Sequence, residues 1–189
     1  MLTRRTFIQS SLVILTVPFG GVAGAAVRSP VPVYLRSFST CGCPDSEQFQ
    51  EVFCTACQRI DHDVGGCLQQ ISSDYSQNSP SVLFGLTRDT DEVLISQLAV
   101  EQGYKKIYEG KHRYTTTDLH HSLRGSEDNI SRMHFTLRRA GNAWPRLLAQ
   151  NADHLISSVN LDYQIEVSLP ASRPHDSPGY LVSWAYRKG

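Results

Sequence analysis

The sequence predicts an α+β fold, mainly because of the order of its apolar segments after residue 80. Apolar runs or alternations that are typical of strands occupy residues 81–86, 105–114, 119–123, part of 156–169, and 180–186. Apolar stripes at helical spacing lie between the first and second of these strands, and again between the third and fourth. This order predicts a ferredoxin-like domain, the split βαβ arrangement βαββαβ, with an extra edge strand.

Turn and cap residues mark the ends of several of these elements. Asp89 and Glu92 have the spacing of a capping box, and Gly103 is placed to end the first helix. The polar turn at residues 115–118 predicts that the strands on either side of it pair antiparallel. Residues 173–178 predict a surface loop between the last two strands.

The second helix is expected to start at residues 125–128, where acidic side chains suit the helix dipole. Its apolar stripe is formed by Ile130, Met133, His134 and Leu137. We expect His134 to be a packed core histidine with a hydrogen-bond partner. A short helix is expected to restart at Trp144-Pro145, and Trp144 and Trp184 are expected in the core.

A Cys-rich part precedes this domain. Residues 31–38 predict a strand, and Ser46 is a suitable cap for a helix that follows. Apolar residues continue the helical spacing at Phe49, Val52, Phe53, Cys57 and Ile60.

The chain is therefore expected to have three parts. Residues 1–25 form a leader, residues 26–79 a small Cys-rich segment with one helix, and residues 80–189 the α+β domain. Residues 74–79 are the best linker between the last two parts.

The five cysteines of the chain all lie within 27 consecutive residues, at Cys41, Cys43, Cys54, Cys57 and Cys67. Three interpretations are open. In the first, two disulfides join the loop to the helix and one thiol is left over. In the second, thiolates from the C-x-C and C-x-x-C pairs bind zinc or an iron–sulfur cluster, with His62 close by.

The third interpretation is thiol–disulfide exchange. Cys41-Gly42-Cys43-Pro44 follows a predicted strand and precedes a predicted helix. This layout resembles that of thioredoxin-like proteins, and the resemblance implies a reactive thiolate near a helix N-terminus. The sequence departs from that family because it has C-x-C, a more strained ring, in place of C-x-x-C.

The N-terminus carries a targeting signal. Arg4 and Arg5, followed by Thr6-Phe7-Ile8, resemble the twin-arginine export signal. A moderately apolar stretch follows and ends in Ala23-Gly24-Ala25, an A-x-A cleavage pattern. The resemblance implies that the twin-arginine machinery exports the folded protein to the bacterial periplasm, often with a cofactor or a larger partner. An ordinary secretory signal, or a leader retained as a membrane anchor, are the alternatives.

Histidines offer a second candidate site. His112 and the pair His120-His121 approach one another across the predicted hairpin, and with Asp118 they offer weak ligands for copper or zinc. Alternate residues of a strand face opposite sides, so His120 and His121 cannot both point at one ion. Ordinary surface or partly buried histidines are the simpler interpretation.

Composition excludes some classes of function. The formal net charge is +0, which argues against a general nucleic-acid binder. The chain lacks the G-x-S-x-G, Walker and G-x-G-x-x-G motifs. No motif places the mature sequence in a named family.

Two functions remain as hypotheses. The first is an exported periplasmic accessory or binding protein without turnover, held together by a disulfide- or metal-stapled Cys cluster and partnered with a larger exported redox enzyme. The alternative is a metal, iron–sulfur or thiol–disulfide redox protein that uses the same cluster.

Overall fold

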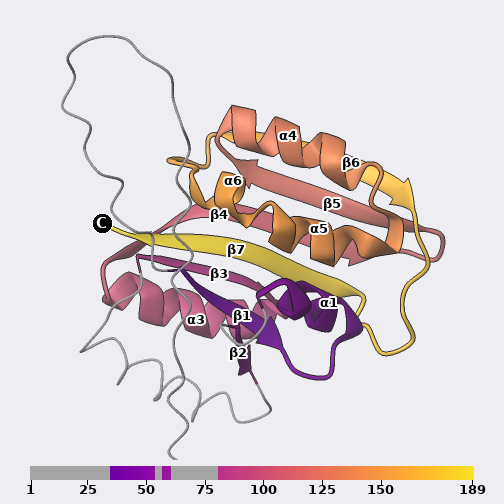
Figure 1. Ribbon diagram of the computed structural model, residues 1–189, viewed down its shortest axis with the longest axis horizontal. Helices are drawn as coiled ribbons and strands as arrows, with labels where there is room; N and C mark the ends of the chain where they lie inside the picture. The colour runs from indigo at the N-terminus through magenta and orange to yellow at the C-terminus, as the bar shows by residue number, and fades with distance from the viewer. Residues whose placement is uncertain (1–34, 54–56, 61–80) are drawn as a thin grey trace, which may run out of the picture. The chain divides into compact units, whose positions relative to one another are not determined.

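A single mixed β-sheet runs through the part of the chain that this computed structural model describes, residues 35–53, 57–60 and 81–189 (Figure 1). The strands lie in the order β2-β1-β3-β7-β4-β5-β6. Their bounds are β1 Leu35–Thr40, β2 Cys57–Ile60, β3 Val82–Thr87, β4 Tyr104–Tyr114, β5 Asp118–Gly125, β6 Tyr163–Pro170 and β7 Tyr180–Lys188. The strands β2, β1 and β3 are parallel, and every pairing from β3 to β6 is antiparallel.

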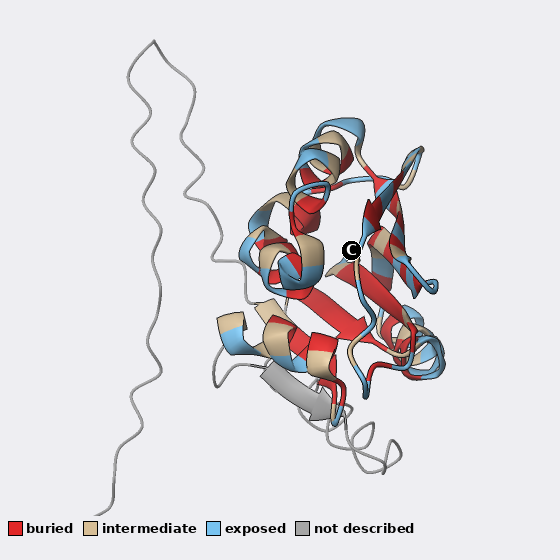
Figure 2. Cartoon of the chain, turned by 90° about the vertical axis from the view of Figure 1, so that its right-hand side faces the viewer, coloured by how far each residue is buried: buried red, intermediate tan, exposed pale blue. Residues whose placement is uncertain are grey.

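Helices cover both faces of the sheet. The bounds are α1 Pro44–Phe53, α3 Asp89–Glu101, α4 Glu127–Leu137, the 3-10 helix η2 Gly141–Ala143, α5 Trp144–Gln150 and α6 Ala152–Ile156. The larger core cluster joins α1, α4, α5 and α6 to one face, and the smaller one joins α3 to the other. Figure 2 shows the buried residues concentrated in the strands and on the helix sides that face them.

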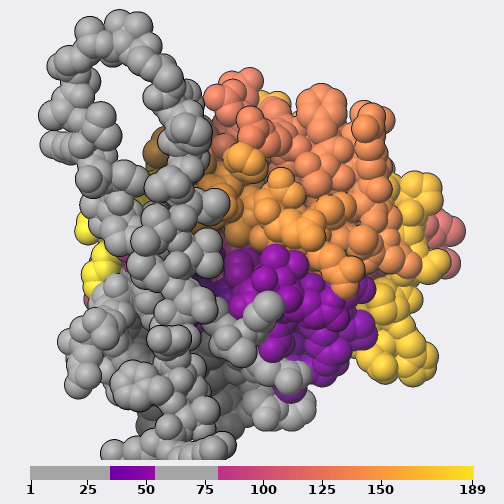
Figure 3. Space-filling model, viewed as in Figure 1, coloured from indigo at the N-terminus to yellow at the C-terminus, as the bar shows by residue number. Residues whose placement is uncertain are grey.

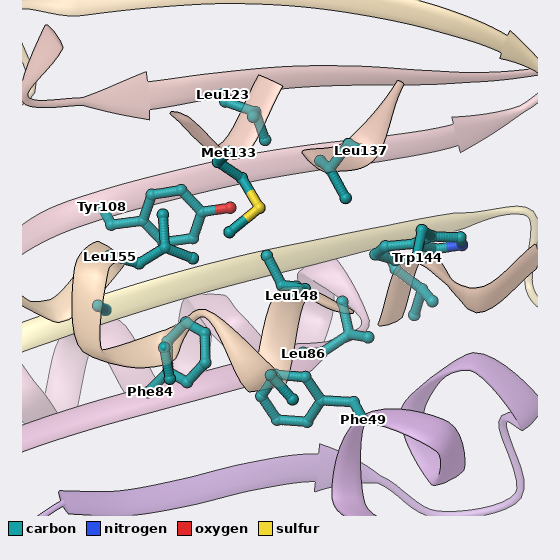
Figure 4. Packing of buried hydrophobic residues seen from close by; sticks show 14 of the residues in the cluster. Phe49, Phe84, Leu86, Tyr108, Leu123, Met133, Leu137, Trp144, Leu148 and Leu155 are labelled. Carbon is teal, nitrogen blue, oxygen red and sulfur yellow. The ribbon is translucent and has the colours of Figure 1, made fainter. Parts of the chain in front are cut away.

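The larger core is closed by apolar residues from distant parts of the chain. Phe49 of α1 packs on Phe84 of β3, with ring centroids 5.3 Å apart. Figure 4 shows Leu148 of α5 and Leu155 of α6 among side chains from the sheet and from α4. In Figure 3 the surface of α1 adjoins that of α5, and the two helices are in contact. Helix α1 is therefore part of the same core as the later helices.

The α+β class is confirmed, and so is the order of elements that the sequence predicts after residue 80. The ferredoxin-like strand order is not shown. Strands β3 and β4 are parallel with one antiparallel strand between them, but that inserted strand is the last one, β7. Because β7 fills this place, β6 lies at the far edge beside β5.

The first part of the chain shares this sheet. Strand β1 pairs with β3 from Leu35↔Val82 to Ser39↔Leu86. The expected strand at residues 31–38 is present in its described part and extends to Thr40. The predicted linker at 74–79, the leader and its Arg4-Arg5 pair lie outside the described residues.

The Cys-rich helix differs from its prediction. It starts at Pro44, ahead of Ser46, and it ends at Phe53. Cys57 and Ile60 belong to β2, so their helical placement is wrong. Main-chain pairing with β1 decides the conformation there, because a sheet can override a short apolar spacing that suits a helix as well.

The predicted caps are only partly correct. Gly103 has φ 80° just after the end of α3, as expected of a glycine in that position. The capping box is wrong, because Arg88 is the N-cap and Glu92 bonds to the Tyr186 hydroxyl instead. His134 is half-buried and stands beside Phe135, so it is not the core histidine that we expect. The other stripe residues of α4 are buried.

The strand predicted within residues 156–169 is β6, and the short helix α6 precedes it. Trp144 and Trp184 are fully buried, as predicted. Among the described helices, none has the length and apolar character needed to cross a membrane.

Candidate functional site

The loop Cys41-Gly42-Cys43 joins β1 to α1. Gly42 has φ 69°, a conformation that residues with a side chain rarely adopt, so the glycine permits this turn. Pro44 occupies the first helical position, where a missing N–H costs nothing. Strand, C-x-C-P loop and helix thus follow one another as the sequence predicts.

Cys43 is the N-cap of α1. Its carbonyl oxygen accepts the amide of Glu47 at 2.9 Å, and its side chain is 0% exposed. Burial raises the pKa of its thiol above the ordinary value of 9.0, and hydrogen bonds from Ser46 offset part of that effect. The nearby charge of Asp45 raises the thiol pKa further. Cys43 is therefore a protonated, buried thiol at neutral pH, whereas Cys41 is half-exposed.

Asp45 is a fully buried carboxyl group beside that thiol. Its Oδ1 accepts the hydroxyl of Tyr114 at 3.0 Å, and its Oδ2 accepts the hydroxyl of Ser177 at 2.8 Å. Burial raises the carboxyl pKa above its ordinary value of 3.8, and the two hydrogen bonds offset part of the shift. A buried carboxyl group with a raised pKa can exchange a proton with its surroundings nearer to neutral pH.

Hydrogen bonds extend inward from Asp45. The indole Nε1 of Trp144 donates to the Tyr114 hydroxyl at 2.9 Å, so Tyr114 lies between an acid and an indole. The Trp144 ring packs on the ring of His112, with centroids 4.3 Å apart. A continuous line of contacts thus runs through the core from Cys43 by way of Asp45, Tyr114 and Trp144 to His112.

The hairpin brings His112 and His121 together, as the sequence predicts. They are directly opposite one another in the register, and their Nδ1 atoms are 2.6 Å apart. Each side chain is 1% exposed. His112 Nε2 is also 2.7 Å from the Ser183 hydroxyl. His121 Nε2 is buried without a hydrogen-bond partner among the described residues.

The other histidine ligand candidates do not join this pair. His120 is exposed on the opposite side of β5, where its ring meets Ser168 of β6. Asp118 bonds within the hairpin turn to Thr115 and Thr117. His62 lies outside the described residues. No group of three or more metal-binding side chains occurs within the part of the chain that the structure describes.

Backbone register separates Cys57 from the C-x-C loop. The Cα of Cys57 is the partner of Ser37, near the start of β1, whereas Cys41 follows the end of β1. The offset is roughly 13 Å at about 3.3 Å per residue. A disulfide requires Cα atoms within about 7 Å, so Cys57 cannot bridge to Cys41 in this register. Cys54 and Cys67 lie outside the described residues.

Sequence reasoning missed the residues that surround Cys43. Asp45 follows the C-x-C-P loop directly, so its position in the first turn of the helix was a usable signal. Ser177 gave no such signal, because it belongs to the loop that we expect at the surface, and it is 3% exposed and reaches Asp45.

Comparisons with known proteins found no match: no family model, no curated protein and no solved structure matches the chain. The site therefore has to be interpreted from its own chemistry.

Proposed function

We propose that this chain is an exported thiol–disulfide redox protein whose reactive pair is Cys41 and Cys43. The observation that carries the proposal is the placement of a buried acid, Asp45, beside a buried thiol at the start of a helix. Cys41, two positions before Cys43, is half-exposed, so its thiolate can reach the disulfide of a partner. Buried polar groups are costly in a core, and active sites are where such groups concentrate.

The reaction has two steps. The Cys41 thiolate attacks one sulfur of a partner disulfide and forms a mixed disulfide, and the other partner sulfur leaves as a thiolate that takes a proton. Cys43 then loses its proton to the Asp45 carboxylate and attacks Cys41 Sγ. The Cys41–Cys43 disulfide forms and the second partner sulfur leaves. The partner gains two electrons and the protein loses two.

The C-x-C ring sets the direction that this exchange favours. A disulfide between residues two positions apart is more strained than one across C-x-x-C, and strained disulfides are the more oxidising ones. The reverse of the two steps above, in which the oxidised protein transfers its disulfide to a partner dithiol and is left with two thiols, is therefore the favoured direction. Gly42, in its left-handed conformation, supplies the turn between the two cysteines.

The partner class follows from the proposed address. The twin-arginine-like leader supports export to the periplasm, an oxidising compartment in which exchange between exported proteins takes place. The substrate is then a dithiol or disulfide of another exported protein, and a larger exported redox enzyme is the partner that we propose. The export itself is tested by mass spectrometry of the protein recovered from the periplasm, where cleavage after Ala25 is expected.

The test traps the mixed disulfide. The mature protein and its variants Cys41→Ser, Cys43→Ser and Cys57→Ser are incubated with a peptide disulfide and analysed by mass spectrometry. Cys43→Ser is expected to accumulate the Cys41–peptide adduct, because the resolving thiol is missing. Cys41→Ser is expected to give no adduct at Cys43, and Cys57→Ser, the control, is expected to form the Cys41–Cys43 disulfide and release the reduced peptide as the parent does.

Equal adduct formation at every cysteine would contradict a dedicated pair. The same purified protein, prepared without reducing agent, is assayed for zinc, copper, iron and free thiols. Stoichiometric metal bound through Cys41 and Cys43 would replace the redox proposal with the metal or iron–sulfur alternative.

A second candidate function is an exported accessory protein that binds a partner without turnover. It is favoured by exposed apolar side chains on helices, namely Val93 and Val100 of α3 and Phe135 of α4. An absence of any catalysed exchange, together with a copurifying exported partner, would favour this function over the redox one.

A further inference from the structure

The His112–His121 pair is a polar island inside an apolar core. Its nearest contacts are the ring of Trp144 from α5 and the hydroxyl of Ser183 from β7, which also bonds to the Tyr108 hydroxyl at 2.8 Å. Both imidazoles belong to the hairpin β4–β5, and the Trp144 ring lies within 5.2 Å of each ring centroid. The start of α5 thus packs on this histidine pair through the Trp144 ring.

The hydrogen bonds of the pair suit two neutral rings. One Nδ1 must donate and the other must accept across the 2.6 Å contact. Because a buried N–H without an acceptor is more costly than a bare lone pair on nitrogen, the favoured tautomer has His121 Nδ1–H donating to His112. His112 Nε2–H then donates to Ser183, and His121 Nε2 stays unprotonated.

Protonation of either ring is not offset by a new hydrogen bond. A proton on His121 must go to Nε2, where no acceptor lies among the described residues. A proton on His112 must go to Nδ1, where it removes the acceptor that His121 uses. Each event puts a positive charge into a core position that is 1% exposed.

We propose that the His112–His121 pair is an acid-operated latch: it holds α5 on the β4–β5 hairpin while both rings are neutral, and it releases α5 when the rings are protonated. Burial lowers the pKa of both rings, to about 3 for His121, which agrees with this arrangement. The sign follows from linkage. A histidine whose pKa is lowered by folding stabilises the fold fully above its unfolded value of 6.5 and loses that stabilisation as the pH falls.

Among the described residues, the groups that face the pair provide no negative charge next to an added proton. From β4 these are the hydroxyls of Tyr108 and Tyr114, both with pKa values raised by burial. The carboxyl of Asp45 and the thiol of Cys43, from the α1 side, lie beyond Tyr114 and Trp144. Coulombic interaction with His120, on the other side of β5, further lowers the pKa of His121. The apolar side chains that α4, β6 and β7 contribute to this core include Met133, Leu137, Val167 and Leu181.

A consequence for the thiol site rests on the proposed function. Trp144 holds Tyr114, and Tyr114 holds Asp45 beside Cys43. Release of α5 removes the first of these contacts, so acid uncovers Cys43 through local opening before the whole fold is lost.

The experiment measures urea unfolding of the mature protein between pH 7.5 and 5.0, with His121→Gln and His120→Gln as a matched pair of variants. Well below pH 6.5 the unfolding equilibrium constant of the parent is expected to rise about tenfold more per pH unit than that of His121→Gln, which lacks one of the two rings. His120→Gln removes only the smaller, Coulombic contribution to the lowered pKa of His121 and leaves burial, the larger one, unchanged, so it is expected to keep the parent slope. Equal slopes in all three proteins would overturn the latch.

A second measurement needs no variant of the pair, in case His121→Gln does not fold. In NMR spectra of the parent, the imidazole signals of His112 and His121 are expected to keep their neutral shifts at pH 5.5, where the same rings titrate in urea. Titration of both rings near 6.5 in the folded protein would also overturn the latch.

The link to the thiol is tested separately in Cys41→Ser, with 4,4′-dithiodipyridine, which reacts with thiols in acid. Cys43 is expected to react severalfold faster at pH 5.5 than at pH 7.5. An unchanged rate would remove the link alone, because the unfolding slopes do not depend on redox activity.

Discussion

The hydroxyl of Tyr114 donates to Oδ1 of Asp45 at 3.0 Å and joins the end of β4 to the first turn of α1. The hydroxyl oxygen of Tyr114 in turn accepts the indole N–H of Trp144 at 2.9 Å. The Tyr114 hydroxyl therefore connects the helix that begins at Pro44 to the helix that begins at Trp144. The chemistry that we propose for Cys43 depends on this connection, because Tyr114 and Ser177 hold the Asp45 carboxyl in place.

Replacement Tyr114→Phe tests this connection. The change leaves the indole N–H of Trp144 and Oδ1 of Asp45 without their buried partner. We expect a loss of about 1–3 kcal/mol in the free energy of unfolding, measured with urea at pH 7.5. Tyr163→Phe, on the edge strand β6, is the control and is expected to cost less than about 0.5 kcal/mol. Equal losses in the two variants would mean that the Tyr114 hydroxyl does not hold the site.

The pH dependence of Cys43 alkylation is a second prediction. In the Cys41→Ser variant, the rate with iodoacetamide is expected to reach half its maximum at a pH above 9.0, because burial raises the thiol pKa. Asp45→Asn is expected to lower that midpoint, since it removes a neighbouring negative charge. Mass spectrometry of the Cys43 peptide measures the rate, and the urea-unfolded variant gives the reference. A folded-state midpoint below that of the unfolded chain would contradict the buried-thiol account.

Gly42→Ala tests whether the C-x-C turn affects the redox equilibrium separately from the stability of the fold. A Cβ at Gly42 meets no atom within 4 Å, so the cost comes only from the φ of 69° and is expected to be about 1–2 kcal/mol. Gly103→Ala is a matched control, because Gly103 also has a positive φ, 80°, and open space. Both variants should lose similar stability in urea, but only Gly42→Ala should shift the redox equilibrium of the protein with glutathione. A similar shift in both would argue against a role for the C-x-C turn.

The order of elements was predictable where apolar periodicity and turn chemistry agree. Gly103 and Ser126 mark helix ends that the structure confirms, and β6 buries the alternation that ends at Val167 and Leu169. The strand order was not predictable from these signals, because they act locally. Insertion of β7 between β3 and β4 depends on long-range pairing, such as Gly85 against Trp184, whose indole leaves no room for a Cβ.

The candidate site divides in the same way. The His112–His121 contact follows from hairpin register alone, so the sequence predicted it. The contacts of Asp45 come from residues 69 and 132 positions away, Tyr114 and Ser177, and no local pattern announces them. The helical spacing predicted Cys57 on the helix that carries Phe49, but pairing of β2 with β1 places this residue in a strand.

The most direct test of the central claim is the disulfide map of the mature protein. The protein is oxidised with glutathione disulfide, its remaining thiols are alkylated, and its peptides are sequenced by mass spectrometry. The account predicts a bond between Cys41 and Cys43, which forms and breaks with the glutathione ratio. Cys43 recovered as an alkylated thiol in the fully oxidised protein, with Cys41 joined to Cys54, Cys57 or Cys67, would contradict it.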